Sequence, residues 1–176
     1  MHSPQRLSLS LFAVAFLSSV SVFGDVYLSI PGVQGESVDQ SHEGWVACES
    51  VQFGIERTSD ERLPVFTGLT LTRPVDASSP ALFLKAASGT VDSVITVEIS
   101  DSVGDVYMAI QLRKANVAEY STSIADGGEA VETIRLRFSH ITLAMYPRDS
   151  RTGELLNPVV RGWNVSTGVR DDTWVK

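Results

Sequence analysis

The sequence has a single cysteine, Cys48, and only three histidines, which stand far apart at His2, His42 and His140. One thiol cannot form an internal disulfide, and a metal site built on thiolates or imidazoles needs several ligands at short, regular spacings. No such spacing occurs in the chain. We therefore predict no disulfide framework, no metal site and no cofactor. Cys48 lies in an apolar, strand-like run, which favours a packed thiol over a reactive one.

Basic residues are also scarce. Lysine and arginine number 14 against 21 aspartates and glutamates, which gives a formal net charge of −7. Binding of nucleic acid depends on clustered Lys and Arg that neutralise phosphates, so we expect no nucleic-acid partner. Glycine and proline occur at ordinary frequencies, and the chain is 43% hydrophobic over 176 residues. These values are typical of one globular domain with its own core.

Common catalytic motifs are missing as well. The sequence has no P-loop, no G-x-G-x-x-G and no G-x-S-x-G. Asp101 and Asp105 could form the carboxylate pair of a glycosidase, and Trp45, Trp163 and Trp174 could form a carbohydrate platform. Solvated turn carboxylates and core tryptophans are the favoured interpretations. We predict no catalytic residues, with a secreted β-sandwich hydrolase as the alternative.

The longest charge-free apolar run lies at the amino terminus. It spans residues 7–23, contains five serines, follows a polar leader with one positive charge, and is followed by Gly24. This is the pattern of a secretory signal peptide, with cleavage between Gly24 and Asp25. The run is shorter and more polar than a membrane span of about 20 residues. We predict a secreted or periplasmic protein without stable membrane insertion, and an uncleaved anchor is the alternative.

From Asp25 onward, apolar residues alternate in short segments separated by turns, which is typical of antiparallel β-structure. The pattern predicts an all-β barrel or sandwich of seven to nine strands. The predicted strands cover residues 25–30, 45–55 with an irregularity near 49–50, 65–73, 93–100, 106–113, 117–124, 130–146 with a bulge near 139–140, and 159–165.

The sequence of residues 79–88 predicts a short α-helix. Ser79 can cap the first amides, Pro80 suits the first helical position, and Gly89 suits the left-handed residue that ends a helix. A helix of this length must pack to be stable. We expect it to pack through Leu82, Phe83 and Ala86.

Three segments in this order resemble the Hcp family, the tube-forming proteins of the bacterial type VI secretion system. They are D25-V-Y-L-S-I-P-G-V-Q-G-E-S37, L69-T-L-T-R-P-V-D-A-S-S-P-A-L-F-L-K-A-A-S-G89 and R161-G-W-N-V165. In that family a strand leads into a G-x-x-G-E-S turn, a D-x-x-(S/T)-P-x-L segment begins the only helix, and a G-W strand ends the domain. The resemblance covers about residues 25–167. It leaves residues 1–24 as the signal peptide and 168–176 as a C-terminal tail.

The resemblance implies a two-sheet β-barrel, mainly antiparallel, with one short helix packed on its side. It also implies homo-hexameric rings that stack into a tube without catalysis, with the chain itself, other secretion-system components or effectors as partners. The family's stacking loop corresponds here to a shorter, charged segment with Glu56, Arg57, Asp60, Glu61 and Arg62.

The predicted signal peptide departs from the family, whose members are loaded from the cytoplasm. A secreted relative that acts as a binding or surface-assembly module outside a type VI machine is therefore the alternative function.

Overall fold

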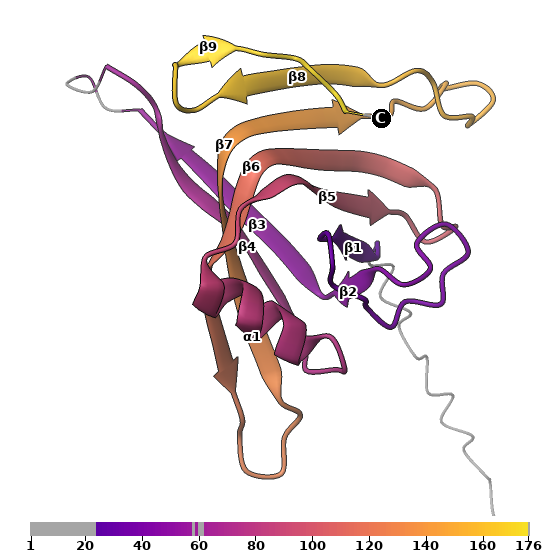
Figure 1. Ribbon diagram of the computed structural model, residues 1–176. Coiled ribbons are helices and arrows are strands. Elements are labelled where there is room, and N and C mark those ends of the chain that lie inside the picture. The colour runs from indigo at the N-terminus through magenta and orange to yellow at the C-terminus, as the bar shows by residue number, and fades with distance from the viewer. Residues whose placement is uncertain (1–23, 58, 60–61, 176) are drawn as a thin grey trace, which may run out of the picture.

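The computed structural model describes residues 24–57, 59 and 62–175. The predicted signal peptide, except Gly24, lies outside these residues. The described part forms one continuous nine-stranded sheet that is bent into an open barrel with one helix on its side (Figure 1), and the two facing layers of this barrel are called its two sheets. Its elements are β1 (Val26–Ser29), β2 (Val46–Cys48), β3 (Ser50–Glu56), β4 (Val65–Pro74), α1 (Ser79–Ser88), β5 (Asp92–Ser100), β6 (Val106–Ser123), β7 (Val131–Met145), β8 (Val159–Asn164) and β9 (Val169–Arg170).

All strand pairs are antiparallel, as predicted, and they follow the order β2-β1-β5-β6-β7-β4-β3, with β8 added to β7 and β9 to β8. The two ends of this path are consecutive in the chain, because only Glu49 separates β2 from β3. The N–H of Glu49 donates to the carbonyl of Thr72 over 2.8 Å. One run of chain therefore borders both sheets. The single strand predicted over residues 45–55 is wrong, because the segment is divided at Glu49, within the predicted irregularity, into two strands with different partners.

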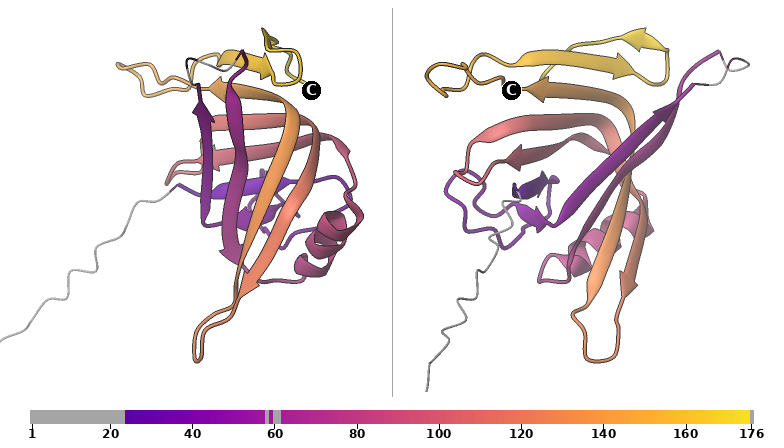
Figure 2. Two further views of the ribbon diagram at one scale, coloured as in Figure 1. Left: turned by 90° about the vertical axis from the view of Figure 1, so that its left-hand side faces the viewer. Right: turned by 180° about the vertical axis from the view of Figure 1, so that it is seen from behind.

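The strands β6 and β7 belong to both sheets. They pair with each other from Met108 opposite Met145 to Ser123 opposite Val131. At one end β5 and β8 flank this pair, and at the other end β4 lies beside β7. Both strands bend midway, so the same pair of strands enters two sheets (Figure 2).

The bend in β6 explains where the strand prediction fails. Residues 106–113 and 117–124 were expected as separate strands, but they form one, with Lys114 at a φ of 48° and a register shift between Val117 and Glu119. A bulge bends a strand without ending its ladder. The alternation is interrupted there while the pairing with β7 continues.

The predicted bulge in β7 near residues 139–140 is wrong. Arg113 faces His140 and Ala115 faces Phe138, so β7 keeps its register with β6 through this region. The extra residue sits on the partner strand instead. Ile134, Leu136 and Ile141 lie in the core as expected, with Phe138 and Leu143 packed against it, whereas Met145, also expected on that face, is exposed.

The core lies between the two sheets. Side chains from both inner faces are buried together there, and their removal from water is the main stabilising term of such a fold. They include Leu28, Val46, Leu69, Leu71, Ile95, Val97, Ile110, Leu112, Ile134 and Leu136.

The helix α1 spans Ser79–Ser88, as predicted, and ends at Gly89 with a φ of 63°. The predicted cap is wrong, because Ser78 occupies the N-cap position and makes no side-chain cap bond. The Ser79 hydroxyl accepts the N–H of Asp76 over 3.1 Å instead. Leu82 is fully buried and Ala86 packs against the core, but Phe83 is exposed and meets only the edge of Tyr120 among the described rings.

A buried ionic cluster lies before the helix. The Arg73 guanidinium pairs with Glu132 at 3.2 Å and with Asp76, and it donates to the Ser78 hydroxyl over 2.6 Å. The Tyr120 hydroxyl donates to Glu132 over 2.7 Å. Buried charges are tolerated only when they are paired and hydrogen-bonded. This cluster therefore joins β4, β6, β7 and the start of α1 in one arrangement.

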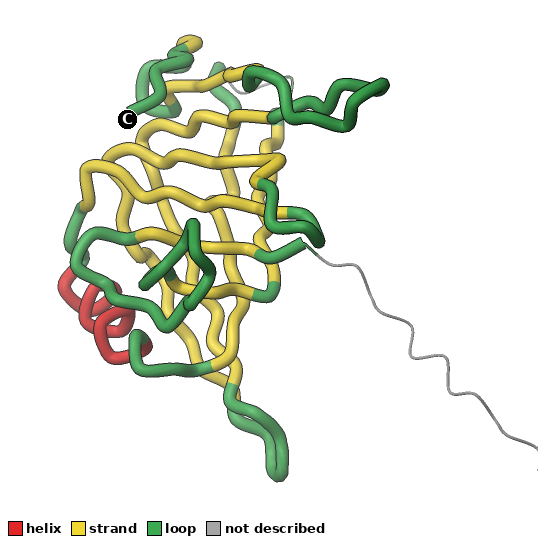
Figure 3. Tube along the Cα trace, turned by 90° about the vertical axis from the view of Figure 1, so that its right-hand side faces the viewer, coloured by secondary structure: helices red, strands yellow, loops and turns green. Residues whose placement is uncertain are grey.

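The loop between β1 and β2, residues 30–45, folds back over the strands (Figure 3) and is held by a buried histidine. His42 is 0% exposed, with Nδ1 2.7 Å from Asp39 and Nε2 2.9 Å from Glu98. Its ring stacks on Tyr27 with centroids 4.0 Å apart. Each ring nitrogen is thus within hydrogen-bond distance of a carboxylate, one in the loop and one on β5, and these two contacts hold the loop to the sheet.

The C-terminal residues 171–175 lie across the outer face of β6, β7 and β8. The side-chain amide of Gln111 donates to the carbonyl of Val175 and accepts its N–H, and Thr142 donates to the carbonyl of Thr173. A Cβ at Gly162 would overlap the backbone of Asp171, so glycine is required where the tail crosses β8. The domain boundary at residue 167 stays a prediction, but the residues after it pack on the barrel.

Two leucines of α1 test the contribution of helix packing. Leu82 is 0% exposed and Leu84 is 64% exposed. We expect Leu82→Ala to lower the free energy of unfolding by about 2–5 kcal/mol, because it leaves a cavity in the core. The matched change Leu84→Ala should shift it by about 0.5 kcal/mol or less. Urea unfolding followed by circular dichroism measures both, and equal effects would contradict the packing of this helix.

The His42 contacts predict a pH dependence of stability. The hydrogen bond from the imidazole lowers the pKa of Asp39 below its ordinary value of 3.8. A carboxylate whose pKa is lowered in the folded state stabilises that state at pH values above its ordinary pKa. This contribution is lost as the pH falls through the pKa of the folded state. We expect Asp39→Asn to lower the melting temperature at neutral pH and to match the wild type in strong acid. The exposed turn variant Asp126→Asn is the control, and a pH-independent difference would refute the expectation.

Candidate assembly surfaces

The segment predicted to stack rings lies at the end of the long β3–β4 hairpin, which projects away from the barrel (Figure 1, upper left). Glu56 is the last residue of β3, and Arg57 and Arg62 are exposed in the connection that follows. Asp60 and Glu61 lie outside the described residues. The segment is thus placed at a projecting tip, and its role in stacking stays a prediction.

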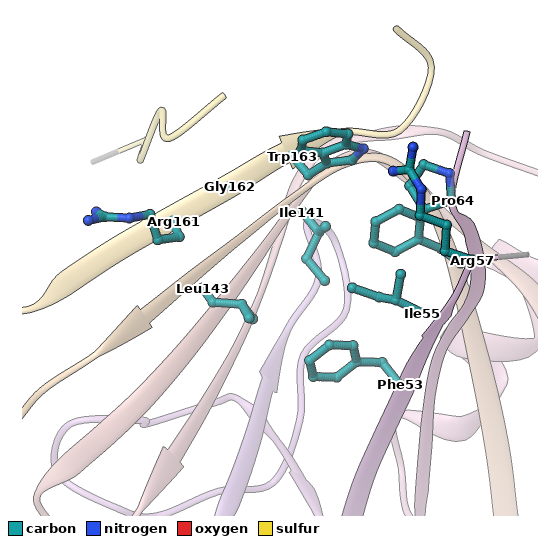
Figure 4. A pocket seen from close by; sticks show the side chains of 10 residues that line it. Phe53, Ile55, Arg57, Pro64, Ile141, Leu143, Arg161, Gly162 and Trp163 are labelled. Atoms are coloured by element: carbon teal, nitrogen blue, oxygen red, sulfur yellow. The ribbon is translucent and has the colours of Figure 1, made fainter. Parts of the chain in front are cut away.

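A cavity of about 370 Å³ opens between β3 on one side and β7 and β8 on the other (Figure 4). Phe53 and Ile55 point toward Ile141 and Leu143 across it, and Trp163 forms its upper wall. The complete lining is Phe53, Ile55, Arg57, Pro64, Phe66, Ile141, Leu143, Arg161, Gly162 and Trp163. It is apolar except for two arginines. It exists because the barrel wall is not paired between β3 and β8.

One residue of the lining, Trp163, has a polar atom without a partner. The indole Nε1 of Trp163 is buried and has no hydrogen-bond partner among the described residues. A buried donor without a partner costs about 1–3 kcal/mol. The indole N–H is closed off from the surface, so the accessible lining of the cavity is apolar apart from the two arginines. Sequence reasoning missed this site, because the lining comes from four strands and alternation alone does not show which strands remain unpaired.

The three tryptophans occupy separate parts of the fold. Trp45 meets the edge of His42 with ring centroids 5.1 Å apart, Trp163 lines the cavity and packs against the core, and Trp174 lies in the C-terminal tail. Core packing is thus the main role of Trp163.

Asp101 and Asp105 are turn carboxylates that share one arginine. Both pair with Arg148, Asp105 at 2.9 Å, and Asp101 also accepts the N–H groups of Val103 and Asp105. Desolvation opposes the shift, but these N–H donors and the guanidinium together lower the pKa of Asp101. A glycosidase acid needs a raised pKa instead. The arrangement fixes the β5–β6 turn and offers no proton donor for hydrolysis.

The one thiol is also unsuited to chemistry. Cys48 is half-buried at the end of β2, and burial raises its pKa to about 12. The thiolate is the reactive form, so Cys48 is nearly always protonated and unreactive at neutral pH.

Within residues 24–57, 59 and 62–175, no group of three or more His, Cys, Asp and Glu side chains is placed to hold a metal ion. The helix in this part of the chain is neither long nor apolar enough to cross a membrane.

The loop between β1 and β2 forms a second distinctive surface. Val38 is 95% exposed, and Glu36 and Glu43 of the same loop are also exposed. Neither glutamate forms an ion pair with a described residue. The loop therefore presents one apolar side chain with free negative charge around it.

Comparisons with known proteins agree with these features. Residues 27–145, more than half of the chain, match the family described as "Type VI secretion system effector, Hcp". A solved type six secretion system protein is 23% identical, with a TM-score of 0.76 over 84% of this chain and 99% of that one. Hcp1 from Salmonella typhimurium is 22% identical, with a TM-score of 0.74 over 85% and 99% of the two chains. The secreted protein Hcp3 from Pseudomonas aeruginosa is 16% identical, with a TM-score of 0.57 over 80% and 97%.

At these identities the solved structures establish the fold alone, and the family match carries the assignment. No curated protein matches the sequence. Members of the family self-associate into rings and tubes. The chain belongs to the Hcp family and is a structural tube component of a type VI secretion system, not an enzyme.

Proposed function

We propose that this chain assembles into six-membered rings and that the rings stack into a hollow tube that other secretion-system components or effectors contact. The family match over residues 27–145 is the observation that carries the proposal. The barrel, its single lateral helix and the projecting β3–β4 hairpin support it. A ring of identical subunits needs two different complementary surfaces on each copy.

We assign ring stacking to the end of the β3–β4 hairpin. The connection after β3 is rich in charges of both signs, with Asp60, Glu61 and Arg62 among them. Opposite charges on facing rings would pair there, and such exposed pairs set register more than affinity. The hairpin also projects beyond the barrel, as a segment that reaches a neighbouring ring must (Figure 2).

We further propose that residues 1–24 are an export signal removed before Asp25. A charge-free run before Gly24 supports this proposal. Export through a general secretory route favours a second candidate function, in which the same barrel works outside a type VI machine as a secreted surface-assembly module. The domain would then consist of residues 25–167, with 168–176 as its tail.

Ring formation and stacking are tested together. We expect the purified protein to have six times the subunit mass by native mass spectrometry and to form stacks in negative-stain images. Replacing Asp60, Glu61 and Arg62 by serine should leave the ring mass unchanged and shorten the stacks, because the charge pairs between rings are lost.

The matched control replaces Asp126 and Glu129 in the β6–β7 turn by serine, and it should stack normally. A stable wild-type monomer would contradict the ring, and normal stacking of the triple variant would contradict the assignment of the hairpin.

The export signal predicts a defined amino terminus. Protein recovered from the periplasm or the medium should begin at Asp25, because signal peptidase cleaves after a small residue such as Gly24. N-terminal sequencing gives the result directly. An intact Met1 on cytosolic protein, with none exported, would show that the leader is not a signal and would favour loading by a type VI machine.

A further inference from the structure

We infer that the contact within the ring joins the β1–β2 loop of one copy to the cavity between β3 and β8 of the next, with Val38 entering the cavity and Glu36 and Glu43 facing Arg57 and Arg161. This contact rests on the proposed ring and names its two surfaces.

The loop is built to present Val38 rigidly. Gly35 donates to the carbonyl of Gly44 over 2.8 Å and Ser37 to that of Trp45 over 3.1 Å, while the buried His42 ties the loop to the barrel. The fold thus orders a loop in which the side chain of Val38 is 95% exposed. A pre-organised loop loses little conformational entropy on binding, which is the condition for a strong contact.

The cavity has the complementary properties. Its lining is apolar apart from two arginines, and its volume is about 370 Å³. Arg57 and Arg161 are both exposed at its edge. Burial of the Val38 side chain against this apolar lining would stabilise the contact.

Charge makes this pairing selective. The chain carries a net charge of −7, so most faces of two copies repel each other. The loop has Glu36 and Glu43 without ion pairs to described residues, and the cavity edge has two arginines. Complementary potential directs two surfaces together and disfavours other pairings.

The two surfaces also lie on different parts of the molecule. In Figure 1 the loop lies on the right, whereas β8 and the hairpin end of β3 lie at the top and upper left. A contact between different patches of identical subunits is heterologous, and such contacts close into rings when the rotation permits.

Charge reversal on separate chains tests the contact. One variant carries Glu36→Lys and Glu43→Lys, and the other carries Arg57→Glu and Arg161→Glu. In a ring made of either variant alone, like charges would face each other across every contact. We therefore expect the fraction of protein in rings, measured by native mass spectrometry, to fall about tenfold or more. Mixing the two variants brings opposite charges together at every contact of an alternating ring. The mixture should therefore recover rings that neither variant forms.

A second pair of variants tests the apolar part. Val38→Asp should lower the ring fraction, because it places a carboxylate against an apolar cavity floor. Val91→Asp changes the same residue type at another exposed position, 64% exposed beside α1, and should leave the ring intact. Thermal unfolding of each monomeric variant shows that it remains folded.

The outcomes separate the two proposals. If the wild type forms no ring, the proposed function is wrong and this contact falls with it. If the wild type forms rings and the charge-reversed variants also do, the rings exist but use other surfaces. Rings lost in both variants and not recovered on mixing would likewise overturn the contact.

Discussion

The structure depends on the ladder between β6 and β7. These strands stay paired from Met108 opposite Met145 to Ser123 opposite Val131 while each bends from one sheet into the other. Each of the other strands pairs with β6 or β7 directly or through neighbouring strands, and the consecutive strands β2 and β3 form the two ends of this order. The bulge at Val117 and Glu119 allows the bend, because it adds a residue to one strand and leaves the pairing intact. Without this bend the two apolar faces would not meet.

Buried polar groups then fix the parts that an apolar core cannot position. Arg73 and Glu132 join β4 and β7 near the start of α1, and His42 joins the β1–β2 loop to Glu98 of β5. Arg73 and His42 each contact two carboxylates, so alternative placements of the helix or loop would leave buried polar groups without partners. Removing such a partner is costly, and this makes the loop and helix rigid surfaces suited to assembly.

The groups that could perform chemistry have structural roles. Asp101 and Asp105 hold Arg148 across a turn, Cys48 is a protonated, partly buried thiol, and Trp163 packs against the core. A tube subunit works through shape and through the two or three surfaces that contact other copies. The open side of the barrel between β3 and β8 is the place where this fold leaves apolar surface unpaired, and the ring contact inferred above uses it.

Local sequence was enough to predict much of the fold. Pro80 and Gly89 delimit the helix because backbone constraints at its ends are local, and alternating side chains located most strands because a strand has a two-residue period. The irregularity near Glu49 was predicted for the same reason, but not that it divides the segment into two strands with different partners. Motifs of the Hcp family such as Gly162-Trp163 then suggested how these elements are arranged. Glycine is needed at position 162 because the C-terminal tail crosses β8 there.

Long-range contacts decided the rest. Ser79 does not cap the helix because Asp76 lies close enough to bond it, and the bulge sits on β6 instead of β7 because the register of two strands is a property of the pair. The bond between His42 and Glu98 joins residues 56 positions apart, and the cavity is lined from four strands. The sequence by itself determined which segments become strands and helix, since those depend on neighbouring residues. Only the tertiary structure decided which strand edges stay open and which charges meet, since those depend on residues that folding brings together.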